Sequence, residues 1–427
     1  MLAARTSASR GATRLARSFA TVVDSAGVKV ASVDYGQPTS AVTLLVKAGS
    51  RYQTKPGVAH ALKNFAFRGT SKRSALGTIR ETELYGGVLS SSLSREYLAL
   101  TAEFLRGDEE YFVDLLSSFV TSAKLTRHEM AEIVHPVIEA EAASAQEDPA
   151  TRALEIAHTL AFRAGLGYSL FAAPHSHVTT EDVKTFASSA FSKDGIAVLG
   201  TGIEQSALQE LVQKHLNASQ LSGSGLKTSA SSYYGGETRV EHGSGLQTVF
   251  IGYGTTTPSA ELAALSAHIS AQPSLKWSQS TVPSATGLTA GTTVQSVYLP
   301  YSDAALFGIL VQGPTSQAVK QAGQAAVKAL KDATGSSGLK AEDLKKAVAK
   351  AKFQAASVSE SREGIFSVLG SKVLAGSDAS VDSLVSSLDK INSAAFSKAT
   401  SALVKAKPTY VAVGDVDTLP YADELGL

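Results

Sequence analysis

The feature that most constrains the fold is an internal repeat at an offset of 214 residues. The segment AKLTRHEMAEIVHPVIEAEAAS, residues 123–144, matches SGLKAEDLKKAVAKAKFQAASV, residues 337–358, at this offset. The segment AVLG, residues 197–200, meets VAVG, residues 411–414, at the same offset. Because two separated blocks share one offset, chance similarity between Ala- and Ser-rich segments is disfavoured. We therefore expect two homologous halves of about 200 residues each.

A third pair of similar segments does not keep this register. SSAFSK, residues 188–193, matches SAAFSK, residues 393–398, at an offset of 205. A short insertion would then be needed to restore the offset of 214 before the last block. We therefore expect the two halves to differ in length at this point.

Each half opens with strand-like segments and continues with long helical ones. VKVASVDYG (28–36) and SAVTLLVKAGS (40–50) predict strands in the first half, and LQTVFIGYG (246–254) predicts one in the second. EEYFVDLLSSFVTSAKL (109–125) and SQAVKQAGQAAVKALKDA (316–333) have the apolar period of helices. Because strands cluster apart from helices, we expect an α+β fold in which each half is a largely antiparallel mixed sheet with helices packed against it.

The join between the halves is predicted in a Ser/Gly-rich stretch. ASQLSGSGLKTSASSYYGG, residues 218–236, has no apolar period, which favours a linker. We therefore expect an N-terminal domain at residues 20–217 and a C-terminal domain at residues 237–427.

The first 19 residues are typical of a mitochondrial transit peptide. The first 20 residues contain four arginines and no acid, and Arg10, Arg14 and Arg17 share one helical face. These residues contain no continuous apolar stretch, which disfavours a secretory signal. RSFAT, residues 17–21, resembles a matrix processing site with the cut after Phe19, so we expect the mature chain to begin near Ala20.

Composition excludes several function classes. The chain has no cysteine, which excludes disulfides, cysteine-based zinc sites and thiol nucleophiles. No apolar run approaches the ~20 residues of a membrane-spanning helix. The net charge is +1, and loss of four arginines would leave 35 basic and 38 acidic residues. Such a chain has no electrostatic footprint for nucleic acid.

Three segments of the first half carry a resemblance to a known family. They are GVAHALKNFAFRGT (57–70), ELYGGVLSSSLSREYLALTAEFL (83–105) and VIEAEAA (137–143). Together they resemble the N-terminal half of the pitrilysin/mitochondrial processing peptidase family, which has an H-x-x-E-H helix and a distal Glu. That family is itself built of two such halves. The resemblance therefore covers essentially the whole mature chain and implies a metallopeptidase-like tandem repeat.

The resemblance places four residues at the metal-site positions of the family: His60, Lys63, Asn64 and Glu141. In active members two His and the distal Glu bind zinc, and the Glu between the His acts as general base. Here Lys63 stands at the base position and Asn64 at the second ligand position. An ammonium group repels a dication and cannot accept a proton from water, and Asn is a poor zinc ligand. We therefore expect no bound metal and no catalytic residue, with His60 and Glu141 as a hydrogen-bonded or solvated remnant.

A segment of the second half indicates which inactive branch the chain resembles. YSDAALFGI, residues 301–309, is similar to the YSDSGLFGI segment of a core protein of ubiquinol–cytochrome c reductase, respiratory complex III. The alternative is the alpha-type, substrate-binding subunit of the mitochondrial processing peptidase. That subunit carries a long glycine-rich loop, and residues 274–310 contain no such run.

The core-protein interpretation implies a structural role on the matrix side of the mitochondrial inner membrane. It implies as partners a homologous core 1-like chain and the cytochrome b, cytochrome c1 and Rieske subunits, through which the chain would associate with the membrane. No segment resembles a haem, quinone or iron–sulfur ligand set, so no cofactor is expected.

Overall fold

The computed structural model describes most of the chain after the predicted transit peptide. The described residues are 22–25, 27–34, 36–216, 221, 223–243, 245–270, 288–335, 339–358, 364, 370, 372–374 and 381–427. The predicted transit peptide, residues 1–19, and its predicted cleavage point lie outside them.

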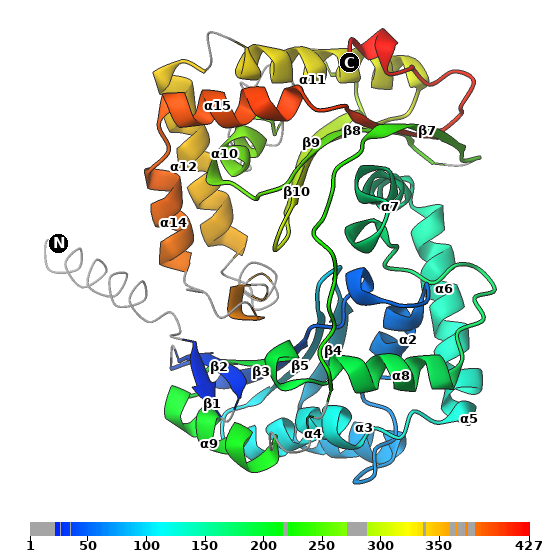
Figure 1. Ribbon diagram of the computed structural model, residues 1–427, viewed down its shortest axis with the longest axis vertical. Coiled ribbons are helices and arrows are strands. Elements are labelled where there is room, and N and C mark those ends of the chain that lie inside the picture. Colours follow the sequence, from blue (N-terminus) through cyan, green and yellow to red (C-terminus); the bar gives the residue numbers. More distant parts are fainter. Residues whose placement is uncertain are drawn as a thin grey trace, which may run out of the picture. The chain divides into compact units, whose positions relative to one another are not determined.

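The chain divides into two compact units (Figure 1). The first comprises the described residues within 1–141, 170–228 and 359–383, and the second those within 142–169, 229–358 and 384–427. Residues 142–169 come from the N-terminal half of the chain but belong to the second unit.

The first unit is built on a six-stranded sheet. Its strands are β1 (Val23–Ser25), β2 (Val28–Val33), β3 (Thr39–Val46), β4 (Val88–Leu93), β5 (Leu98–Leu105) and β6 (Ile196–Thr201). Their order is β1-β2-β6-β3-β5-β4, and only the β2–β6 pair among them is parallel.

Helices cover one face of this sheet. They are α2 (Val58–Asn64), α3 (Ala75–Leu84), α4 (Glu109–Ser122), α5 (Arg127–Glu129), α6 (His135–Glu147), α8 (Thr180–Ala190) and α9 (Gln205–His215), with α6 running on into the second unit. Alternate residues of β3 (Val42, Leu44 and Val46) point into a core shared with α2, α4, α8 and α9. This alternation is the period of two that the sequence predicts for a strand.

The second unit repeats the same strand order. Its strands are β7 (Gly236–Glu241), β8 (Gln247–Thr255), β9 (Thr293–Pro300), β10 (Ala305–Gly313) and β11 (Thr409–Gly414). The order β7-β11-β8-β10-β9 corresponds to β2-β6-β3-β5-β4, and again only the first pair is parallel. The predicted α+β fold of two homologous domains is therefore confirmed.

The helices of the repeat correct one sequence match. SSAFSK covers the last residues of α8 and the turn after it, whereas SAAFSK opens α15 (Ser393–Val404). The helices themselves end 214 residues apart, at Ala190 and Val404, so no insertion is needed. The match at an offset of 205 was wrong, because short Ala/Ser/Phe segments recur by chance in helices of this composition.

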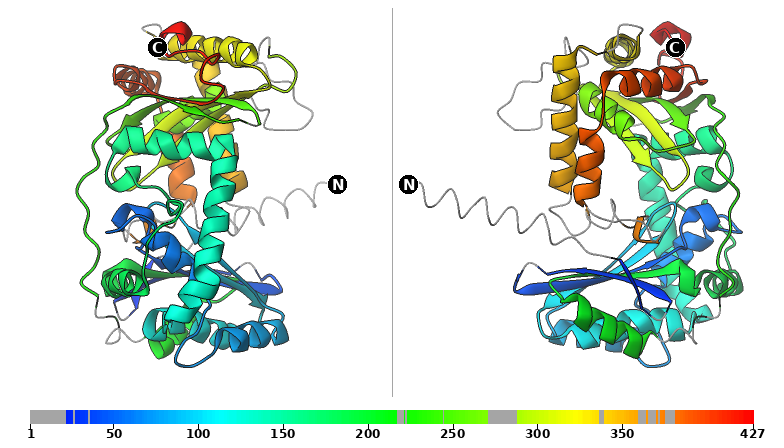
Figure 2. Two further views of the ribbon diagram at one scale, coloured as in Figure 1. Left: turned by 90° about the vertical axis from the view of Figure 1, so that its right-hand side faces the viewer. Right: turned by 60° about the vertical axis from the view of Figure 1, so that its left-hand side comes forward.

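The second sheet is covered on both faces, as Figures 1 and 2 show. Its helices are α7 (Pro149–Phe162), α10 (Ala260–Ile269), α11 (Ser316–Thr334), α12 (Ala341–Val358), α14 (Val381–Asp389) and α15. Val249 and Ile251 of β8 face a core shared with α10, α11 and α15. Phe250, between them, faces a separate cluster formed with Ala153, Ala157 and other residues of α7.

The segment YSDAALFGI is held by contacts within the second unit. Tyr301 donates its hydroxyl to Nε2 of His158 in α7, at 2.7 Å. Asp303 accepts hydrogen bonds from the backbone and hydroxyl of Ser231. Gly308 lies under the ring of Phe250, where a Cβ atom would overlap that ring. These residues of the motif therefore fasten the sheet to its neighbours.

Candidate functional site

Helix α2 starts at a glycine that no other residue could easily replace. Gly57 has φ of 87°, in the left-handed region, and its N–H donates to Oε1 of Gln53 at 3.1 Å. A Cβ on Gly57 would lie 2.7 Å from that of Ala172. The helix is therefore packed tightly against the loop that contains Ala172, while its residues Val58, Ala59, Ala61 and Leu62 enter the core.

The imidazole of His60 is buried and held from both sides. The backbone N–H of Ala172 donates to Nδ1 at 3.1 Å, so this nitrogen must carry a lone pair. The proton therefore sits on Nε2, which donates to Oε2 of Glu141 at 2.5 Å. The ring of Phe171 lies edge-on to the imidazole, with 5.6 Å between centroids.

Glu141 lies in α6 and receives three side-chain donors from α2. Besides His60, Lys63 donates from Nζ to Oε1 at 2.5 Å, and Asn64 donates from Nδ2 to Oε2 at 3.0 Å. Asn64 also donates to the carbonyl of His60, one turn earlier. Residues three and four positions apart share a helix face, so α2 presents all three donors to one carboxylate.

The electrostatics of this cluster favour the charged carboxylate. The hydrogen bond from His60 lowers the pKa of Glu141 most, and partial burial raises it. The hydrogen bonds from Lys63 and Asn64 and the charge of Lys63 lower it further, so the pKa falls to about 2. The side chain of Glu141 is 33% exposed, so water also screens its ion pair with Lys63.

The structure brings together all four residues that the sequence places at the metal-site positions. The donor set does not fit a zinc ion, because the Lys63 ammonium lies against the Glu141 carboxylate, where it would repel a dication, and Asn64 supplies a poorer zinc ligand than an imidazole. In the described part of the chain, no group of three or more His, Asp or Glu side chains could hold a metal ion.

Two contacts of the cluster were missed by sequence reasoning. The backbone of Ala172 and the ring of Phe171 lie more than 100 positions after His60. Both belong to a loop without a recognisable motif, and no sequence signal could have paired them with the helix.

Comparison with known proteins identifies the family to which the chain belongs. Residues 29–173 match the family model for insulinase, peptidase family M16. The chain is 43% identical to cytochrome b-c1 complex subunit 2 of Cryptococcus neoformans var. grubii, over 99% of this chain and 98% of that protein. The chain belongs to the family of subunit 2 of the mitochondrial cytochrome b-c1 complex.

Two further relatives have the same name, and one solved structure is similar in fold alone. The Yarrowia lipolytica subunit 2 is 38% identical, over 97% of this chain and 99% of that protein. The human subunit 2 is 29% identical, over 93% of this chain and 90% of that protein. A protease from Helicobacter pylori has the same fold, with a TM-score of 0.79 over 94% of this chain and 100% of that one, at 17% identity.

Proposed function

We propose that the chain is core protein 2 of the mitochondrial cytochrome b-c1 complex, respiratory complex III, and acts there as a structural subunit without catalytic activity. The observation that supports this assignment best is 43% identity to a named subunit 2 over nearly both full lengths. The Cryptococcus, Yarrowia and human relatives all carry that name, so the alternative of a processing-peptidase alpha subunit is not favoured.

The absence of catalysis is proposed from the cluster around Glu141. An active member needs a carboxylate general base and an open metal position. Here Lys63 stands at the base position and its ammonium neutralises Glu141 at 2.5 Å. The cluster therefore joins α2 to α6 as a purely structural contact.

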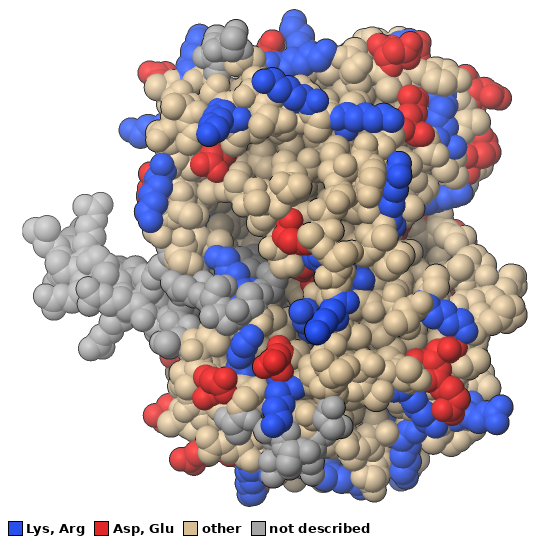
Figure 3. All heavy atoms as spheres, viewed as in Figure 1, with Lys and Arg blue, Asp and Glu red and all other residues tan. Residues whose placement is uncertain are grey.

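We further propose the matrix side of the inner membrane as the location, with a core 1-like chain and the cytochrome b, cytochrome c1 and Rieske subunits as partners. Among the described residues, no helix is long and apolar enough to cross a membrane. Basic and acidic side chains are interspersed over the face seen in Figure 3, without a field of one sign. Both observations are compatible with attachment through protein contacts.

Fractionation of mitochondria tests this function. We expect the chain to co-purify with the haem-bearing inner-membrane complex in a fixed ratio to its haem. Recovery of the chain in the soluble matrix, without haem, would contradict the proposal and favour a free processing subunit. Sequencing of the native N-terminus in the same fraction should find a start near Ala20; a start at Met1 or Leu2 would reject the proposed transit peptide.

A further inference from the structure

Lys63 is the least exposed lysine in an ion pair among the described residues. Its side chain is 17% exposed, whereas the side chains of the other lysines in such pairs are 29–76% exposed. Its Nζ lies 2.5 Å from Oε1 of Glu141. Because it is costly to remove a charge from water unless a partner is held in place, this pair is a fixed part of the fold rather than a mobile surface contact.

The charge of Lys63 matches the charge of the ion that it stands against. In active members of the peptidase family, the zinc ion brings two positive charges, and the general base and the distal Glu bring one negative charge each. The imidazole ligands are neutral, so such a site is neutral overall. Replacement of the base by Lys63 changes the charge by two positive units, the same as the charge of the ion, and leaves Lys63 and Glu141 as a neutral pair.

The other two donors to Glu141 do not supply this charge. Nδ1 of His60 accepts from the backbone N–H of Ala172, so the imidazole is neutral when Nε2 donates to Oε2 of Glu141. The amide of Asn64 is also neutral and donates to the same oxygen. The positions of the two imidazole ligands therefore each keep a neutral donor, and the position of the base supplies the cation.

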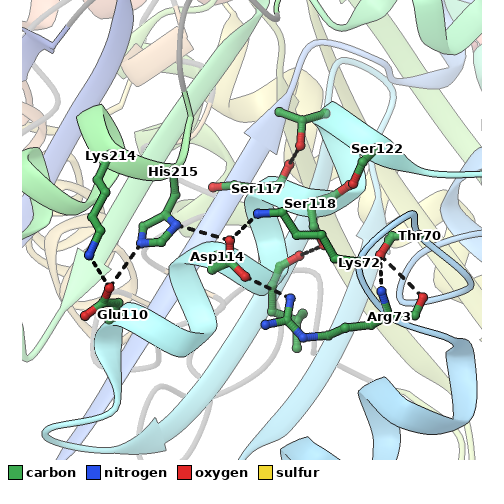
Figure 4. Close-up of polar contacts among 12 residues, drawn as sticks. Thr70, Lys72, Arg73, Glu110, Asp114, Ser117, Ser118, Ser122, Lys214 and His215 are labelled. Carbon is green, nitrogen blue, oxygen red and sulfur yellow. Dashed lines mark hydrogen bonds and ion pairs between the residues drawn. The ribbon is translucent and has the colours of Figure 1, made fainter.

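A second carboxylate of the same unit provides a contrast, as Figure 4 shows. Asp114 of α4 accepts from Lys72 at 2.6 Å, from Arg73 at 2.8 Å and from Nδ1 of His215 at 3.1 Å. Loss of Lys72 would therefore leave Asp114 paired with the guanidinium of Arg73. Among the described residues, Glu141 pairs with no lysine or arginine besides Lys63, so loss of Lys63 would leave its charge unbalanced.

We propose that Lys63 takes the place of the divalent metal ion of active peptidases, as a cation fixed within the chain that balances Glu141 and holds it against α2. The four residues at the metal-site positions can then stay together without a metal. This inference rests on the non-catalytic function proposed above. It adds the chemical means by which the chain keeps its folded site after losing the ligands and the base.

A charge cycle at positions 63 and 141 tests the proposal. Lys63→Met keeps most of the side-chain length but leaves the charged Glu141 with neutral donors only. We expect the purified chain with this substitution to melt about 2–6 °C lower at neutral pH than the unmodified chain. When Lys63→Met is combined with Glu141→Gln, no charge remains to be balanced, so the double variant should melt at a higher temperature than Lys63→Met alone.

The cycle distinguishes charge from packing. If Lys63 acted only through the packing of its methylene groups, Lys63→Met would lower the melting temperature equally with Glu or Gln at position 141. Equal losses would overturn the proposal, and so would a Lys63→Met chain that melts like the unmodified one. If Lys63→Met alone does not fold, the double variant decides: a folded double variant supports the charge role, and an unfolded one overturns it.

Lys72→Met is the matched control. It also removes a lysine from a carboxylate that accepts from a histidine, but Arg73 still balances Asp114. We expect its melting temperature to fall by less than about 2 °C. A fall as large as that of Lys63→Met would show that the effect belongs to any paired lysine, which would overturn the particular role of Lys63.

Addition of zinc chloride provides a second measurement. In Lys63→Met, Nε2 of His60 and the carboxylate of Glu141 no longer face an ammonium group, and both are groups that bind zinc. About 0.1 mM zinc should therefore raise the melting temperature of Lys63→Met by at least about 2 °C. The unmodified chain, Lys72→Met and the double variant should not respond. No rise in Lys63→Met, or an equal rise in all four proteins, would contradict the replacement of a metal ion by Lys63.

The outcomes separate this inference from the proposed function. Stoichiometric zinc in the unmodified chain, found by metal analysis, would contradict the non-catalytic function itself. If the unmodified chain binds no zinc and the loss from Lys63→Met is the same with Glu or Gln at position 141, only the role of Lys63 is wrong.

Discussion

His158 and Tyr301 share a hydrogen bond of 2.7 Å, although they are 143 positions apart in the chain. His158 donates from Nδ1 to the carbonyl of Leu154, so Nε2 of the neutral ring accepts from the Tyr301 hydroxyl. The contact joins α7, from the N-terminal half of the sequence, to the loop before β10. It thus fastens together two of the three parts of the chain that build the second unit.

Replacement of Tyr301 by Phe should therefore destabilise the second unit. The variant removes the hydroxyl donor from a buried imidazole nitrogen, for which a cost of about 1–2 kcal/mol in the free energy of unfolding is expected. Chemical denaturation followed by circular dichroism measures the change. A double-mutant cycle with His158→Leu is the control, and a coupling energy near zero would contradict the role given to this hydrogen bond.

A second prediction concerns the segment that contains α7. A fragment of residues 237–427 lacks this helix and should expose Phe250, Leu306 and Leu310 on the uncovered face of its sheet. We expect that fragment to aggregate, whereas a fragment of residues 142–427 should elute as a folded species on size exclusion. In the longer fragment, Ala157→Glu should restore aggregation, because a charge would enter the cluster. A monomeric, cooperatively melting fragment 237–427 would refute the prediction.

The packing of α7, from the N-terminal half of the sequence, against the sheet of the second unit could not be predicted from the sequence. The repeat and the strand patterns were sufficient for the fold class and for two equivalent sheets. The apolar face of α7 consists largely of Ala153, Ala157 and Ala161, small residues that suit many neighbouring surfaces. Such a face does not reveal which sheet it will cover, because small side chains carry little shape information.

At the candidate site, too, the sequence predicts some of the contacts and not others. The helical spacing of His60, Lys63 and Asn64 places them on one face, and the family resemblance adds Glu141. The sequence argument considered Lys63 only as a residue that repels a metal ion and cannot act as a general base. Its ion pair with Glu141, 78 positions later, depends on how α2 and α6 pack, which local patterns do not specify.

A third prediction tests the close approach at Gly308. A Cβ atom there would overlap the ring of Phe250, so Gly308→Ala should destabilise the chain by about 1–3 kcal/mol. Thermal unfolding measures the shift. Gly243→Ala is a matched control, since nothing lies within 4 Å of a Cβ at that position. The smaller side chain of Phe250→Leu should partly rescue Gly308→Ala, and equal loss in both backgrounds would argue against the proposed overlap.

A fourth prediction concerns acid stability. The pKa of Glu141 is lowered from its ordinary value of 4.5 to about 2, so folding favours the charged form. The contribution of the charged Glu141 to the free energy of unfolding should be complete above about pH 5. It should be lost as the pH falls through the range between these two pKa values. Glu141→Gln should cost about 1–2 kcal/mol at neutral pH, a modest figure because the side chain is one-third exposed.

Denaturant titrations of both proteins from pH 7 to pH 2 measure this difference. The gap between the unmodified chain and Glu141→Gln should narrow as the solution is acidified. Glu139→Gln, two positions earlier on the same helix and without a resolved contact to α2, controls for a general loss of negative charge. A gap that stayed constant down to pH 2 would contradict the assigned pKa.

The last prediction concerns zinc binding and peptide hydrolysis, the chemistry of active members of the peptidase family that the sequence resembles. Lys63→Glu combined with Asn64→His would place a carboxylate at the base position and a second imidazole one turn after His60. In the structure, His60 Nε2 and Asn64 Nδ2 already converge on Oε2 of Glu141, at 2.5 and 3.0 Å. With the ammonium removed, these three positions could serve as zinc ligands, so the double variant should gain zinc affinity.

Peptidase activity should remain low, because substrate must also be positioned to within fractions of an ångström, which ligand geometry alone does not ensure. Metal analysis and a fluorogenic peptide assay on both proteins would decide: stoichiometric zinc with chelator-sensitive hydrolysis in the unmodified chain would overturn its non-catalytic assignment, and a double variant that binds no zinc would refute the alignment of Glu141 with the distal ligand.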